Sequence, residues 1–275
     1  MSTYNHLVAE QINIRELVKQ SESALLKQLP GWAYVLLEKI VYQDEINRII
    51  NKYSEFEGVD FLSKMVDEFK IEPVVSGIEN LPAHGKCFFV ANHPYGIADG
   101  LLLTCIISSR YGNLKAIGND VFMLIPQLRP LIAAVNVFGS NYRDYIRELT
   151  GVYKSEIPVT HFPAGRVSRV IKFRVEDGIW QKSFISKAVE CKRDIVPIYF
   201  PGKNSSLFYF IYLLRKMFFI KTNLELTLLP RELFNKKNRK IRVVIRKPIP
   251  YNTFDNSRSH SEWAQWVKTR VYRDE

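Results

Sequence analysis

From Ile71 onward, short apolar runs alternate with longer segments that carry apolar residues at helical spacing. Such alternation is typical of a parallel sheet whose strands are covered by helices on both faces. The runs expected to form strands are 74–78, 87–91, 114–117, 133–138, 158–162, 195–200 and 241–245. The segments expected to form helices are 99–110, 120–130, 141–155, 182–190, 206–220 and 259–271. We predict an α/β fold with a mostly parallel central sheet.

The first 70 residues have a different pattern, because apolar residues there recur at helical spacing with no strand-like run between them. Leu25, Leu26 and Leu29 belong to one such stretch, and a broader apolar stripe continues after Pro30. We expect residues 1–70 to be either a helical cap on the core or a membrane-facing segment. Residues 71–275 are expected to form the α/β domain.

Composition limits the class of partner. Hydrophobic residues make up 47% of the 275-residue chain, which is enough for a packed core. The formal net charge of +11 predicts an anionic partner, namely nucleic acid, a membrane surface or an acidic carrier protein. The chain has no recognised nucleic-acid-binding motif, so we expect no nucleic acid among its partners.

Targeting and cysteine patterns bear on location. Residues 1–16 have no apolar signal core, and no apolar run reaches the roughly 18–20 residues that a spanning helix needs. Cys87, Cys105 and Cys191 lie far apart, which shows neither a disulfide framework nor metal-ligand spacing. We expect a protein in the reducing cytosol, either soluble or peripheral on a membrane, with no metal and no tightly bound cofactor.

Two stretches of the sequence are compatible with contact with a membrane but do not require it. Residues 207–220 are apolar and aromatic apart from Arg215 and Lys216, and they suit either a membrane interface or a buried helix beside an acyl-binding groove. A basic cluster follows between Arg231 and Lys247. It is either a solvated charged face or a contact surface for anionic lipid.

The run that ends in Ala91 is followed by a loop that carries His93, and Asp99 lies near the start of the next expected helix. A carboxylate that binds one imidazole nitrogen leaves the other free to accept a proton, which makes this a minimal general-base pair. The alternative is a loop histidine beside an aspartate that only caps the helix.

Four short blocks occur in order at the ends of expected strands. They are NHPYGIADG (92–100), VFGSNYR (137–143), HFPAGRVSR (161–169) and IVPIYF (195–200). Together they resemble the glycerolipid acyltransferase family, which includes glycerol-3-phosphate and lysophosphatidic acid acyltransferases. The resemblance covers roughly residues 75–250 and is closest to a bacterial lysophospholipid acyltransferase branch often labelled hemolysin-like.

The resemblance implies a role for each block. His93 would be the general base and Asp99 the residue that orients it. Arg143 would hold the anionic head group of the acceptor; its alternative is a salt bridge to Glu148. The other residues expected to contact substrate are Asn92, Gly139, Gly165, Arg166 and Arg169. Family members typically have Glu at the position of Ala164.

The activity implied is transfer of a fatty acyl chain from an acyl thioester to the hydroxyl of a lysolipid, without a covalent acyl-enzyme. The donor would be acyl carrier protein or acyl-coenzyme A, and the acceptor a lysophospholipid or a lyso-aminolipid. The expected location is the cytoplasmic face of the cell membrane, as a peripheral protein on an anionic surface. The alternative function is that of a non-catalytic lipid-binding protein at the membrane surface, with the same fold.

Overall fold

The structure is a computed structural model that describes residues 11–20, 27–135, 142–220 and 222–273, without the side chains of residues 17, 20, 120, 135 and 142–145. The described chain contains a seven-stranded sheet with the order β1-β9-β8-β2-β5-β3-β4. Its strands are β1 (Glu72–Ser76), β2 (Cys87–Ala91), β3 (Lys115–Asn119), β4 (Ile132–Val135), β5 (Val159–His161), β8 (Asp194–Tyr199) and β9 (Lys240–Ile245). These match all seven expected strands, with shifts of no more than two residues at the ends that the structure describes.

Most strand pairs are parallel, which confirms the predicted fold class. Strand β2 pairs in parallel with both β8 and β5, and β3 pairs in parallel with β5 and β4. Strand β9 is antiparallel to β8 and parallel to β1. Strands β1 and β9 therefore run opposite to the other five, and only those five have their carboxyl ends at the edge where β2 ends.

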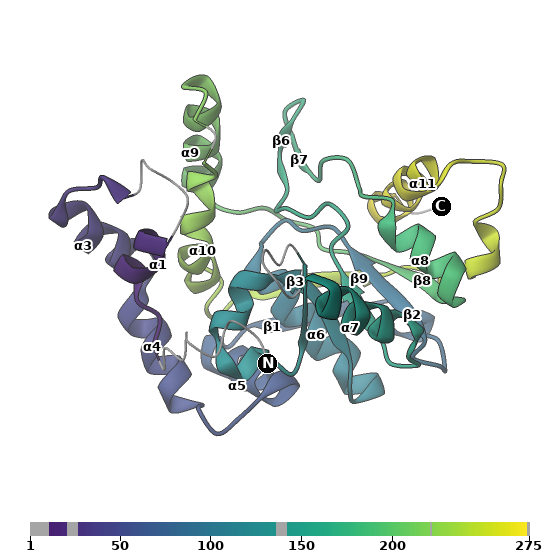
Figure 1. The fold of residues 1–275 in the computed structure, drawn as a ribbon. Helices are drawn as coiled ribbons and strands as arrows, with labels where there is room; N and C mark the ends of the chain where they lie inside the picture. Colours follow the sequence, from purple (N-terminus) through teal and green to yellow (C-terminus); the bar gives the residue numbers. More distant parts are fainter. Residues whose placement is uncertain (1–10, 21–26, 136–141, 221, 274–275) are drawn as a thin grey trace.

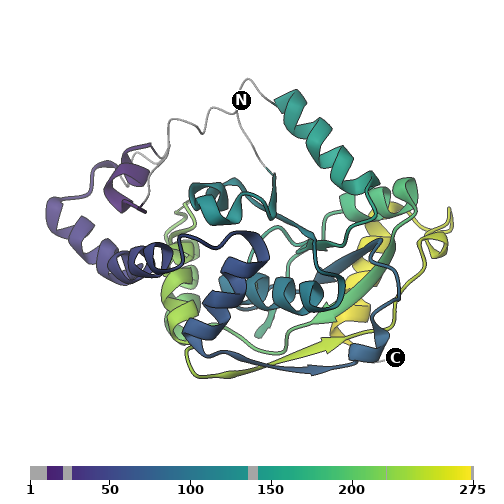
Figure 2. The same ribbon diagram turned by 90° about the horizontal axis from the view of Figure 1, so that it is seen from below.

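Helices cover both faces of the sheet (Figures 1 and 2). The helices of the described chain are α1 (Ile14–Gln20), α3 (Gly31–Ile40), α4 (Gln43–Lys52), α5 (Gly58–Phe69), α6 (Ile97–Tyr111), α7 (Tyr142–Lys154), α8 (Ser183–Cys191), α9 (Ser206–Met217), α10 (Leu229–Phe234) and α11 (His260–Tyr272). Apolar residues of α4, α5 and α6 form one core with the sheet, and those of α8 and α11 form a second core. The second half of the N-terminal segment thus packs on the α/β core.

Strand β2 shows how the sequence builds both layers. Cys87, Phe89 and Ala91 belong to the core on the α6 side, whereas Phe88 and Val90 belong to the core on the α8 side. Successive side chains of a strand point to opposite faces, so a continuous apolar run is needed where both faces are covered. All five residues are at most 1% exposed.

One expected helix was wrong. Residues 120–130 form two short 3₁₀ turns, Asp120–Leu124 and Pro126–Leu128, instead of an α-helix. Pro126 has no backbone N–H and disfavours helical geometry in the residue before it, and Pro130 does the same at the other end. Two further elements were not expected from the sequence: helix α10, and a two-stranded hairpin made of β6 (Arg169–Ile171) and β7 (Arg174–Glu176).

Arg193 is a fully buried cation that joins α7 to the sheet. Its guanidinium donates hydrogen bonds to main-chain carbonyl oxygens of Val152, Tyr153, Ser155, Ile157 and Cys87. The first three belong to the last turn of α7 and the residue after it, where carbonyls have no partner within the helix. Arg193 therefore takes the place of a helix C-cap.

We expect Arg193→Leu to lower the free energy of unfolding by about 3 kcal/mol or more, because each buried carbonyl left without a donor costs roughly 1–3 kcal/mol. Urea unfolding followed by circular dichroism measures the change. Lys187→Ala, at a half-buried lysine of α8, is the matched control and should change stability by less than about 0.5 kcal/mol. Equal stability of Arg193→Leu and the wild type would contradict this account.

Candidate active site

His93 lies just beyond the carboxyl end of β2, between the neighbouring strands β5 and β8. Ligand sites in open α/β sheets form at this edge. The chain turns after His93, and α6 begins at Ile97. Gly96 makes the turn possible: its φ of +76° favours glycine, and an added Cβ would lie 2.7 Å from Leu229 Cδ2.

Asp99 faces both His93 and the start of its own helix. Its Oδ2 lies 3.1 Å from His93 Nδ1 and accepts hydrogen bonds from the backbone N–H groups of Tyr95 (2.8 Å) and Gly96 (2.9 Å). The sequence allowed Asp99 to be either the partner of His93 or a cap of the helix. The structure shows both contacts, because one carboxylate oxygen caps α6 and also contacts the imidazole. The loop between His93 and Asp99 wraps around this oxygen.

Burial dominates the electrostatics of Asp99. The residue is 0% exposed, and loss of hydration raises the pKa of its carboxyl group above the usual value. The contact with His93 and the two backbone donors act in the opposite direction and favour the carboxylate. The buried Asp99 carboxylate is therefore most stable when the His93 imidazole donates a hydrogen bond to it.

The imidazole of His93 is fixed but accessible. Its ring stacks on Phe162, with 4.0 Å between ring centroids and 25° between planes, and its side chain is 18% exposed. Because Nδ1 is turned toward Asp99, Nε2 is on the opposite side of the ring. This arrangement can accept a proton at Nε2 while Nδ1–H points at the carboxylate.

Asp177 is a second buried carboxylate at the site, and it was not among the residues predicted from the sequence. Its Oδ1 accepts hydrogen bonds from the backbone N–H of His93 (3.2 Å) and from Ser168 Oγ (2.5 Å). Its Oδ2 accepts one from Trp180 Nε1 at 2.9 Å. Burial raises the pKa of the Asp177 carboxyl group, and these donors favour its charged form. Asp177 belongs to none of the four blocks, so spacing gave no signal for it.

Asn92 has a structural role in this geometry. Its side-chain amide donates to the Phe200 carbonyl (2.9 Å) and accepts from the Phe200 N–H (2.7 Å), and the residue is 2% exposed. These bonds join the ends of β2 and β8. We expected Asn92 to contact substrate, but its amide is engaged with the protein.

Residues of the third block (161–169) differ in their surroundings. Arg166 is exposed next to Gly165, which has a φ of +63° and whose N–H donates to Phe162 O in the turn. The Gly165 N–H is therefore used within the loop, and the expected contact of Gly165 with substrate stays a prediction. Arg169 is buried and ion-paired with Glu225 at 3.0 Å, so it is part of the internal structure rather than a cation facing the site.

Arg143 and Gly139 were predicted from the second block. Gly139 lies outside the described residues. Arg143 lies in the first turn of α7, and its side chain is not described. Their roles stay predictions.

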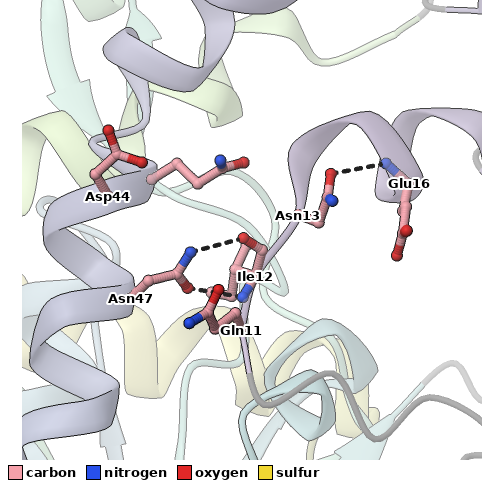
Figure 3. A pocket seen from close by; sticks show the side chains of 7 residues that line it. Gln11, Ile12, Asn13, Glu16, Asp44 and Asn47 are labelled. Atoms are coloured by element: carbon pink, nitrogen blue, oxygen red, sulfur yellow. Dashed lines mark hydrogen bonds between the residues drawn. The ribbon is translucent and has the colours of Figure 1, made fainter.

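A separate polar hollow lies beside α4 at the N-terminal segment (Figure 3). Asn47 donates to and accepts from the backbone of Ile12 there. The residues that line the hollow are Gln11, Ile12, Asn13, Glu16, Gln43, Asp44 and Asn47. None of the predicted site residues is among them. Within the described residues, no group of three or more His, Cys, Asp or Glu side chains could hold a metal ion.

Comparison with known proteins shows which family the chain belongs to. A profile described as "Acyltransferase" matches residues 15–274. The chain belongs to this acyltransferase family. It is 35% identical over 263 residues to the "Lyso-glycine lipid O-acyltransferase" of Phocaeicola vulgatus, covering 95% of this chain and 94% of that protein. The protein of the same name from Bacteroides thetaiotaomicron is also 35% identical over 263 residues, covering 95% of this chain and 97% of that one.

These relatives confirm the expectation that the chain is an enzyme, an O-acyltransferase. The fold agrees with the crystal structure of the 1-acyl-sn-glycerophosphate acyltransferase PlsC from Thermotoga maritima. The TM-score is 0.50 and the sequence identity 16%, and the match covers 86% of this chain and 94% of that one. At this identity the likeness concerns the fold alone.

We expect Asp177→Asn to lower kcat of this acyltransferase by about 10- to 100-fold with little change in either KM, because a small displacement of His93, the expected general base, would have an effect of this size. An amide can accept with only one of its two polar atoms, so either His93 N–H or Trp180 Nε1–H would lose its acceptor. The expected role of Asp177 is to position His93, because it contacts the His93 backbone and not the imidazole.

The measurement is steady-state kinetics, with urea unfolding to show that the variant is folded. Asp255→Asn is the control, because this exposed carboxylate accepts hydrogen bonds from Ser257. A folded Asp177→Asn enzyme with wild-type kcat would refute the role.

Proposed function

We propose that the protein transfers a fatty acyl chain from an acyl thioester to the hydroxyl of a lysolipid. The observation that carries the proposal is the buried Asp99 carboxylate 3.1 Å from His93 Nδ1, at the sheet edge where ligands bind. The names of the two relatives favour a lysolipid with an amino-acid head group over a lysophospholipid. The presence of Ala164 where the wider family typically has Glu favours the same choice.

The proposed mechanism uses His93 as general base. Nε2 takes the proton of the acceptor hydroxyl as its oxygen attacks the thioester carbonyl. The new C–O bond forms and the C–S bond breaks. His93 then gives the proton to the departing sulfur, which leaves as the free thiol of the donor. Asp99 orients the imidazole and stabilises its charged form, as the carboxylate of a catalytic triad does. The acceptor is itself the nucleophile, so no acyl-enzyme forms.

The donor is proposed to be acyl carrier protein or acyl-coenzyme A. Both are anionic, and the net charge of +11 favours the approach of either. Arg143 is the proposed partner of the acceptor head group, and exposed Arg166 is a second cation at the site loop.

We propose that the enzyme works as a peripheral protein on the anionic, cytoplasmic face of the cell membrane. A lysolipid acceptor is presented at such a surface, and the basic chain complements it. None of the described helices combines the length and hydropathy that crossing a bilayer requires. Helix α3 exposes Trp32 (71%) and Leu36 (50%), which fits contact of the N-terminal segment with lipid.

We expect His93→Ala to lower the turnover number by about 10²- to 10⁴-fold, the usual contribution of general acid–base catalysis, and Asp99→Asn to lower it by a smaller factor. The assay offers labelled palmitoyl-carrier protein and palmitoyl-coenzyme A to a panel of lysophospholipids and lyso-aminolipids. His260→Ala at the exposed start of α11 is the control. A folded wild type that transfers to no acceptor would favour a non-catalytic lipid-binding protein, and full activity of His93→Ala would refute the mechanism.

We expect Arg143→Ala to raise the acceptor KM by about 10- to 100-fold with a smaller effect on the donor, because a charge-assisted hydrogen bond contributes about 1.5–3 kcal/mol. Arg147→Ala, one helical turn further along α7, is the matched control. A rise in the donor KM alone would show that the head-group assignment is wrong.

A further inference from the structure

Two phenylalanines are the most exposed large apolar side chains in the part of the chain that the structure describes. Phe173 at the tip of the β6–β7 hairpin is 102% exposed, and Phe219 just after α9 is 90% exposed. Single exposed apolar residues are common, but a side chain that contacts almost nothing contributes nothing to folding. The exposure of Phe173 and Phe219 therefore needs an explanation other than the stability of the fold.

Both residues have backbone conformations that favour glycine or asparagine. Register pairs Ile171 with Arg174, so Lys172 and Phe173 form a two-residue hairpin loop, with φ of +47° and +66°. Asn-Gly is the preferred sequence for such a loop. Phe219 has a φ of +54° and occupies the left-handed position of a Schellman cap, in which Ile220 N–H donates to Arg215 O. The chain thus places phenylalanine where it is disfavoured and unprotected.

The hairpin and α9 pack against each other. Val170 and Val175 of the hairpin pack in one apolar cluster with Phe208 and Ile211 of α9. Arg169 in β6 and Arg215 in α9 both pair with the fully buried Glu225. Figure 1 shows the two elements projecting side by side from the same side of the molecule.

The surroundings of the two phenylalanines are apolar and cationic. Exposed Lys172 and Arg174 flank Phe173, and exposed Lys216 precedes the end of α9. The sequence has no acidic residue from 201 through 224. The outer face and end of α9 expose Leu207, Phe210, Leu213, Met217 and Phe218. Aromatic tips among cations match the boundary between acyl chains and anionic head groups.

We propose that the hairpin tip and the outer face of α9 form the surface that docks on an anionic bilayer, with Phe173 and Phe219 inserted between lipids and Lys172, Arg174 and Lys216 on their phosphates. An apolar surface this strongly aromatic fits lipid better than the charged surface of an acidic carrier protein. The proposal deepens the proposed function and rests on it for its biological meaning.

The surface is directly connected to the candidate active site. The hairpin begins at Arg169, one residue after Ser168, whose N–H donates to His93 O at 2.8 Å. It ends at Glu176, one residue before Asp177, which accepts from His93 N–H. Docking through the tip therefore holds the His93 loop close to the membrane, where a lysolipid is presented.

The test uses Phe173→Asn and Phe219→Asn in the full chain. Asparagine tolerates the left-handed conformation, so each variant should fold at least as stably as the wild type, and only the apolar side chain is lost. Ile78→Asn is the matched control: Ile78 is 52% exposed and follows β1, whose carboxyl end is at the opposite end of the sheet from His93. Binding is measured by co-sedimentation with vesicles of phosphatidylglycerol and phosphatidylethanolamine, without acyl donor.

We expect each phenylalanine substitution to lower the vesicle partition coefficient about tenfold, the scale set by burial of one aromatic side chain, and Ile78→Asn to leave it unchanged. Added salt, pure phosphatidylcholine and Lys172→Gln/Arg174→Gln should each weaken binding. Transfer to a vesicle-embedded lysolipid should fall in parallel, whereas transfer to a short-chain acceptor dispersed as monomers should not change.

Wild-type vesicle binding by both phenylalanine variants would overturn the proposal. So would loss of binding to acyl carrier protein without any loss of vesicle binding, because the surface would then be a protein-docking site. The co-sedimentation result does not depend on turnover, so failure of the acyl-transfer reaction would leave this test intact.

Discussion

The contact of Asp99 Oδ2 with His93 Nδ1 and with two backbone donors is the interaction on which the rest of the site depends. A fully buried carboxylate is costly unless hydrogen-bonded groups surround it, and here the donors come from the loop that the carboxylate itself closes. The same oxygen fixes the start of α6 and the direction of the imidazole. The five residues between His93 and Asp99 therefore form one unit with the helix rather than a free loop.

Other buried polar groups hold the backbone around His93 in the same way. Asp177 ties the His93 backbone to Ser168 and Trp180, and Asn92 joins β2 to β8 just before His93. Each group is buried and hydrogen-bonded, which makes it specific in geometry and expensive to disturb. Such a shell holds the His93 imidazole more firmly than a surface loop could, which is what the proposed role of His93 as general base requires.

Local pattern predicted most of the fold, because strands buried on both faces need continuous apolar runs and the helices between them need periodic ones. It failed at residues 120–130, where apolar periodicity is present but Pro126 and Pro130 prevent a continuous helix. It also missed the β6–β7 hairpin, because its strands are only three residues long and its loop, Lys172-Phe173, has none of the usual turn residues.

The sequence by itself determined the fold class, the family and the identity of the His93–Asp99 pair, since these depend on patterns within short stretches of chain. Only the tertiary structure decided what the other polar residues do. Arg169 was expected at the substrate and is paired with Glu225, while Asp177 was unnoticed and supports His93. The physical reason is that a charged side chain takes its role from whichever partner folding brings within hydrogen-bonding distance, and Glu225 is 56 positions away from Arg169 along the chain.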